Sequence, residues 1–157
     1  MFKGVRRSYT LLALLLMEVI EELGTDRALE MLQRATEGQA EVVHRELSRE
    51  METDLPPLER GVEAYRLFME EAGAEVRVHK READFATFLV RRCPFYEAFL
   101  DIGIDCGYFL GGLCTQITLP AVQATLRRFD PRLTLETVLV RESAEEHCLE
   151  RVRLRED

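Results

Sequence analysis

The first 92 residues of this 157-residue chain contain no cysteine. All four cysteines lie in the second half, at Cys93, Cys106, Cys114 and Cys148. No two of them have the Cys-x-x-Cys spacing, so the usual sequence signature of a structural zinc knuckle is absent. Thiolates that converge in a fold can still bind a metal or act as nucleophiles. The second half of the chain is therefore where we expect chemistry.

An excess of basic residues is also lacking. The chain has 21 Lys and Arg against 29 Asp and Glu, for a net charge of −8. Binding to a phosphate backbone normally needs clustered cations, so we expect no nucleic-acid partner. A hydrophobic content of 46% with 32% charged residues excludes wholesale disorder.

The sequence has no hydrophobic run that could cross a bilayer near its N-terminus. The apolar run at residues 11–17 is too short, and Glu18, Glu21 and Glu22 follow it at once. No small-x-small cleavage motif follows either, so we interpret the run as part of a core helix. We expect no membrane partner and a cytoplasmic location, where thiols stay reduced. The cysteines are then free, metal-bound or catalytic rather than paired in disulfides.

Internal repeats and flexible linkers are absent, and the length suits a single domain over 1–157, with a helical part at 1–73 and a mixed part at 74–157. Apolar periodicity predicts helices at 8–23, from Thr25 to about Asp54, at 58–72, at 95–102 and at 105–129. Period-two patterns predict strands at 75–79, 85–90, 133–141 and 147–155. The order ααα-ββ-αα-ββ predicts an α+β fold with an antiparallel sheet, in which 85–90 is an inner strand.

The first predicted helix has a distinctive apolar distribution. Ser8 is a candidate N-cap and Gly24 a candidate stop. Its apolar side chains nearly encircle the helix, which predicts burial in the core or by a partner subunit. A homodimer through this N-terminal helix is therefore one expectation.

The cysteines supply the candidate site residues. Cys93 precedes Pro94 at a predicted helix start, where the helix dipole would lower its pKa and favour the thiolate, so Cys93 is the candidate nucleophile. Cys106 and Cys114 are eight residues apart, which on a helix brings them within about 80° of each other. Together with Cys93 and Cys148 they are candidate ligands for zinc or another thiolate-bound metal. Simple core packing is the alternative, since free cysteine is often buried.

A glycine-rich segment lies between the second and third cysteines. It has no following Lys-Ser/Thr pair and is not framed as strand, loop and helix, so it is no phosphate loop. Tyr108, Phe109 and Gly111 in this segment are candidates to line an apolar ligand pocket.

The second half of the chain resembles the L-2-amino-thiazoline-4-carboxylic acid hydrolase-like proteins. The resemblance rests on the order of elements and on three places: Cys93-Pro94, Cys114, and Cys148 within 145–152. More distantly this half resembles the 4-vinyl reductase domain, a small-molecule-binding α+β fold. The first resemblance implies hydrolysis of a carbon–nitrogen or carbon–sulfur bond in a small ring, with Cys93 as the thiolate and Cys114 and Cys148 close by. In metal-binding members of the second group, a Glu and a Cys on the penultimate strand hold zinc. This chain departs from that pattern with Thr137 and Val140.

Three functions remain open from the sequence. The chain is either a small-molecule hydrolase, a non-catalytic ligand-sensing domain that acts through a partner, or a helix-driven homodimer with structural cysteines. Turnover of a bound ligand would distinguish the first from the second.

Overall fold

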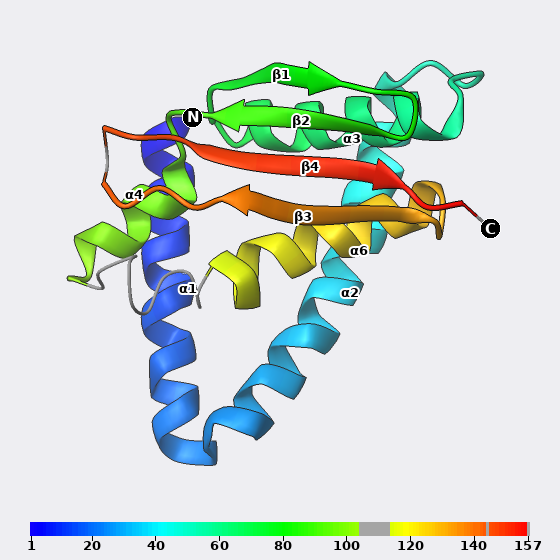
Figure 1. Cartoon of the computed structure of the whole chain (residues 1–157). Coiled ribbons are helices and arrows are strands. Elements are labelled where there is room, and N and C mark those ends of the chain that lie inside the picture. The colour runs from blue at the N-terminus through cyan, green and yellow to red at the C-terminus, as the bar shows by residue number, and fades with distance from the viewer. Residues whose placement is uncertain (104–113, 144, 157) are drawn as a thin grey trace.

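The computed structural model describes residues 1–103, 114–143 and 145–156. The elements in chain order are α1 (Phe2–Leu23), α2 (Thr25–Glu50), α3 (Pro57–Glu71), β1 (Val76–Arg81), β2 (Phe85–Val90), α4 (Pro94–Asp101), the π-helical turn η2 (Cys114–Thr118), α6 (Leu119–Phe129), β3 (Leu133–Leu139) and β4 (Cys148–Leu154). Helices come first and the antiparallel strands later, which confirms the predicted α+β class (Figure 1).

Most helix boundaries lie within one residue of the prediction, but α1 starts at Phe2 instead of residue 8, and α2 ends at Glu50 instead of about Asp54. Gly24 ends α1 with a φ of 80°, a conformation that glycine adopts readily. The predicted N-cap role of Ser8 is wrong, because α1 already begins at Phe2. Pro94 occupies the first turn of α4, as predicted, and Cys93 is the residue before it.

The sheet has the order β1-β2-β4-β3, which confirms 85–90 as an inner strand. Its register decides which side chains face the helices. Ala86, Phe88 and Val90 of β2 are buried, and their partners across the ladder are Val152, Glu150 and Cys148 of β4. Since partners in register share a face, β4 directs Glu150 into the same inner row as these apolar side chains.

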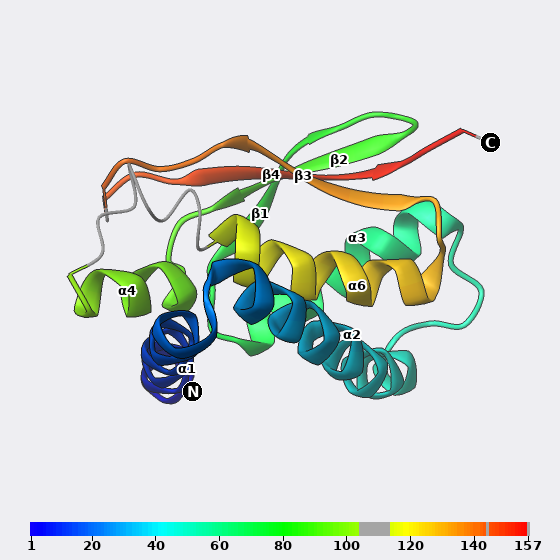
Figure 2. The same ribbon diagram turned by 90° about the horizontal axis from the view of Figure 1, so that it is seen from below.

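The helices cover one face of the sheet. Figure 2 shows α3, α4 and α6 next to the sheet, with α1 and α2 packed beyond them. Helix α3 contacts β4, and α6 contacts β3. The Tyr65 and Phe88 rings meet between α3 and the sheet with centroids 4.4 Å apart. The core therefore lies between the sheet and these three helices.

Gln123 of α6 binds the backbone of β3, a strand at the edge of the sheet. Its Nε2 donates to the Leu133 carbonyl at 2.9 Å, and its Oε1 accepts from the Leu135 N–H at 2.6 Å. One side chain thus satisfies two backbone groups of the edge strand.

Among the described helices, none is both long and apolar enough to cross a membrane.

Candidate functional site

A small cavity lies between the sheet and the helices α4 and α6. Its volume is about 30 Å³. The side chains around it come from α3, β2, α4, η2, α6, β3 and β4, and the loops beside them: Met69, Val90, Cys93, Tyr96, Cys114, Thr115, Thr118, Leu119, Thr137, Val140, Cys148 and Glu150. The cavity exceeds the roughly 10–15 Å³ that one water needs, but is well below the roughly 150 Å³ of a cavity that binds benzene.

Glu150, which lines this cavity, interacts with two buried polar side chains, Tyr65 and Arg141. Tyr65, fully buried on α3, donates its hydroxyl hydrogen to Glu150 Oε2 at 2.5 Å. Arg141, only 2% exposed, donates to the Val90 carbonyl at 2.6 Å and lies over the Tyr96 ring at 4.9 Å. Its cation also acts on the Glu150 carboxylate electrostatically. The interior therefore holds one carboxyl group and one guanidinium in the same network.

Burial dominates the protonation of this network. It raises the pKa of Glu150 above the ordinary 4.5, although the Tyr65 hydrogen bond and Arg141 act in the opposite direction. Burial, reinforced by the neighbouring Glu150, also raises the pKa of Tyr65 well above 10.0. Tyr65 thus remains a neutral hydrogen-bond donor.

Cys93 lines the cavity as a buried free thiol. Burial raises the pKa of Cys93 to about 12, because desolvation outweighs the N–H groups of Tyr96 and Phe95 at the start of α4, which act to lower it. The predicted lowering of this pKa by the helix dipole is therefore wrong. A protonated thiol is a poor nucleophile, so this geometry gives no support to Cys93 as a catalytic thiolate.

The other two described cysteines also reach the cavity. Cys148 is the first residue of β4 and Cys114 the first residue of η2, so the structure brings Cys93, Cys114 and Cys148 to the lining of one cavity. The Nε of Arg141 lies 3.3 Å from Cys148 Sγ and donates to it. A cation at this sulfur opposes the binding of a metal ion there.

The described residues contain no group of three or more His, Cys, Asp or Glu placed to hold a metal ion. Cys93, Cys114 and Cys148 therefore do not form the predicted metal site by themselves. Thr137 and Val140 line the same cavity, and neither offers the carboxylate or thiolate that the zinc-binding pattern requires. Cys106, the fourth candidate ligand, lies outside the described residues, as do the predicted pocket residues Tyr108, Phe109 and Gly111.

Thr118 contributes a second polar feature to the cavity wall. The residue is 6% exposed, and among the described residues its Oγ1 has no hydrogen-bond partner of normal geometry. The Tyr9 phenol interacts with Thr118, which acts to lower the pKa of Tyr9, but burial outweighs this and raises that pKa to about 12. A buried hydroxyl without a good partner is costly, so a polar atom entering the cavity would stabilise it.

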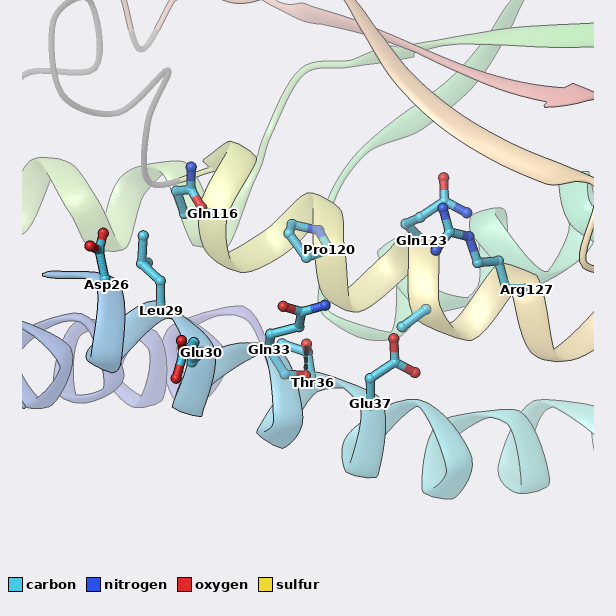
Figure 3. Close-up of a pocket in the computed structure, with 11 residues that line it drawn as sticks. Asp26, Leu29, Glu30, Gln33, Thr36, Glu37, Gln116, Pro120, Gln123 and Arg127 are labelled. Atoms are coloured by element: carbon cyan, nitrogen blue, oxygen red, sulfur yellow. Dashed lines mark hydrogen bonds between the residues drawn. The ribbon is translucent and has the colours of Figure 1, made fainter.

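A larger hollow, of about 430 Å³, lies on the surface between α2 and α6. Figure 3 shows its side chains, with Gln33 and Glu37 on α2 opposite Gln123 and Arg127 on α6. Glu37 and Arg127 are exposed, and Gln123 is already bound to β3. Because these polar groups are solvated or already hydrogen-bonded, the smaller cavity is the better candidate site.

Sequence reasoning missed Glu150, Arg141 and Thr118 as site residues. A signal for Glu150 was present, since the two-residue alternation of β4 places it on the same face as Cys148 and Val152. Its bond to Tyr65, which is 85 residues away in sequence, had no local signal.

Solved structures that resemble this fold include the following two. One is the phenol-responsive sensory domain of the transcription activator PoxR with phenol, with a TM-score of 0.60 and 13% identity over 93% of this chain and 74% of that chain. The other is trafficking protein particle complex subunit 3 from Naegleria fowleri covalently bound to palmitic acid, with a TM-score of 0.52 and 13% identity over 95% and 96% of the two chains. At this identity the similarity establishes the fold alone.

No family model matches the chain, and no curated protein matches its sequence. The structural neighbours agree with the more distant resemblance, to the fold of the 4-vinyl reductase domain, and include a small-molecule-sensing domain. They do not confirm the amino-thiazoline hydrolase-like family, and hydrolase activity has no support from them.

Proposed function

We propose that this chain is a non-catalytic binding domain for a small, largely apolar molecule that carries one hydrogen-bonding group. The observation that carries the proposal is the interior cavity, where apolar walls converge on a few buried polar atoms. Such a combination is typical of small-molecule sites, in which apolar contact supplies affinity and a few polar groups fix orientation.

The polar groups favour a neutral ligand. Arg141 already acts electrostatically on the carboxyl group of Glu150, and Tyr65 donates to Glu150. Among the described residues, the Thr118 hydroxyl has no hydrogen bond of normal geometry apart from its contact with Tyr9, so it can accept or donate a new one. A ligand with a single hydroxyl group would match it, and the phenol held by the PoxR sensory domain is such a molecule.

The size of the cavity adds a requirement. At about 30 Å³ it cannot hold an aromatic ring without widening. The walls at Cys114, Thr115 and Thr118 belong to one short segment, and displacement of that segment would enlarge the cavity. Binding should then be slower than encounter-limited association, because it needs a conformational change.

Calorimetric titration with phenol and with toluene tests the proposal. The wild-type chain should bind phenol more tightly than toluene, and Thr118→Val should weaken phenol binding about tenfold while leaving toluene binding nearly unchanged. The same substitution should raise the stability of the free protein by about 1 kcal/mol, because it removes a buried hydroxyl that lacks a good partner.

Thr125→Val is the matched control. Thr125 is buried on α6, which directly follows η2, but its hydroxyl donates to the Ala121 carbonyl at 3.0 Å and Thr125 does not line the cavity. It should leave both affinities unchanged. Conversion of a substrate to product would overturn the non-catalytic assignment, and equal loss of phenol binding in both variants would overturn the role of Thr118.

A further inference from the structure

Helix α1 carries a second apolar face on the side away from the core. Ala13 and Leu16 are buried against the rest of the protein. Leu11, Leu14 and Leu15 are instead 68%, 44% and 57% exposed. Spacings of three and four residues place these leucines on one face of the helix. A strip of large apolar side chains in water is a candidate interaction surface.

Charged residues extend this strip in both directions along α1. Lys3 and Arg7 precede the leucines, and Glu18 and Glu22 follow them, at helical spacings that keep all four on the same face. All four are exposed, and none forms an ion pair with another described residue. By contrast the adjacent Arg6 is held by Glu97 and Asp101 of α4, which fixes the rotation of α1.

The order of these charges is unfavourable for an isolated helix. Helices are stabilised by acidic groups in the first turn and basic groups in the last turn, and α1 has neither. Its cations lie toward the positive end of the dipole and its carboxylates toward the negative end. A second helix running antiparallel alongside would reverse both relations, because its carboxylates would lie beside the cations of the first.

We propose that this face of α1 docks against the same face of a second copy of this chain, with the two helices antiparallel. A two-fold axis passing between Leu11 and Leu14 places Leu11 of one copy opposite Leu14 of the other. The same symmetry places Arg7 opposite Glu18 and Lys3 opposite Glu22, each twice. The apolar strip supplies the buried area, and the flanking ion pairs set the antiparallel direction. This interface is independent of the proposed ligand cavity.

An exposed apolar helix face could instead bind a membrane surface. Helices that lie on membranes carry Lys and Arg along their polar side. Here Glu18 and Glu22 continue the apolar strip itself, and the whole chain has a net charge of −8. Both features oppose binding to anionic lipid, so the charge pattern favours the second copy.

Charge reversal tests the pairing directly. Analytical ultracentrifugation over a range of protein concentrations should show a dimer for the wild-type chain. Arg7→Glu or Glu18→Arg alone should each weaken it by about tenfold or more, since each replaces two attractive pairs by two repulsive ones. The double variant R7E/E18R should dimerise like the wild type. An equimolar mixture of the two single variants should form a heterodimer.

Two controls separate this effect from misfolding and from net charge. Arg34→Glu and Glu41→Arg make the same charge changes at exposed positions of α2 and should leave the dimer unchanged. Circular dichroism should show equal helix content in all variants. A wild-type monomer at every concentration would overturn the proposal, as would a dimer indifferent to the single reversals. Binding of a monomer to phosphatidylcholine–phosphatidylserine vesicles would overturn it in favour of the membrane.

Discussion

At the scale of single residues, Glu150 determines much of the character of the interior. It lies in the inner row of β4, opposite Phe88, and accepts a hydrogen bond from the buried Tyr65. Burial of a carboxyl group is costly unless it is hydrogen-bonded, paired or protonated. The raised pKa of Glu150 is the expected response, and it makes the stability of the protein depend on pH.

The sign of that dependence follows from linkage. The folded state holds the Glu150 proton more tightly than the unfolded state, so the associated stability is fully present below the ordinary pKa of 4.5. It is lost as the pH rises through the raised pKa. Glu150→Gln keeps the side chain neutral at every pH and retains an acceptor for Tyr65. Urea denaturation at a series of pH values should therefore show that the stability of E150Q increases relative to that of wild type as the pH rises from 4.5 through the raised pKa of Glu150.

Asp130→Asn supplies a control of opposite sign. Its hydrogen bonds to Arg132 lower the pKa of Asp130 below 3.8 in the folded state, so the related stability is lost as the pH falls through the lowered pKa. The deficit of D130N relative to wild type should shrink toward acid. A difference between E150Q and wild type that stays constant with pH would contradict the assignment of a raised pKa to Glu150.

Cys93 makes a separate prediction at this scale. Because its pKa is raised to about 12, the thiol should be almost fully protonated at neutral pH and shielded from reagents. Iodoacetamide should leave Cys93 unmodified in the folded protein and alkylate it after unfolding in urea. Peptide mass spectrometry would measure both, with the half-buried Cys148 as the internal comparison. Rapid alkylation of Cys93 in the folded chain would restore it as a candidate nucleophile.

At the scale of elements, the contact between α3 and the sheet depends on a glycine. A methyl group at Gly61 would lie 2.6 and 2.9 Å from the δ carbons of Leu133 and 3.2 Å from Val152 Cγ1. Leu133 is fully buried, so it has little room to move. Gly61→Ala should destabilise the protein by about 1–3 kcal/mol through overpacking.

Gly38→Ala is the matched substitution within α2. Nothing lies within 4 Å of a methyl group there, and glycine weakens a helix relative to alanine. It should stabilise the chain by about 0.5–1 kcal/mol. Thermal denaturation of both variants would test the pair, and a neutral G61A would mean that α3 can shift away from β3 and β4.

Apolar periodicity and the positions of glycine and proline predicted most elements well, because these signals depend on residues that are neighbours in the sequence. Gly24 marks a helix end and Pro94 a helix start that the structure retains. The predicted start of α1 was wrong because the true start, at Phe2, depends on contacts with residues distant in sequence. The Phe2 ring lies 4.0 Å from the Arg92 guanidinium carbon and packs near Gly73, which holds the first turn in place. No pattern within residues 1–8 encodes those contacts.

The candidate site was predictable only in part, for the same reason. The clustering of cysteines indicated the region, and three of them do line one cavity. Their chemistry depends on what else is buried there, and the effects of Arg141 and Glu150 on them require the folded register of β4.

At the scale of the whole molecule, a single domain over 1–157 remains a prediction. It would comprise the helical part at 1–73 and the mixed part at 74–157. Elements of the first part contact those of the second, as α1 does with α4 and α2 with α6. The chain should therefore unfold in one cooperative transition. Calorimetry, together with circular dichroism and tyrosine fluorescence, should give one coincident midpoint. Two separate midpoints would show that the parts fold independently.

The side chain of Gln123 has a consequence for how copies of this protein can associate. An edge strand offers unpaired backbone groups on which another chain can add a strand and begin aggregation. Gln123 occupies the Leu133 carbonyl and the Leu135 N–H of β3, two groups that an incoming strand would need. That end of the edge is thereby closed to sheet extension, so assembly must use side-chain surfaces rather than a continuous intermolecular sheet along it.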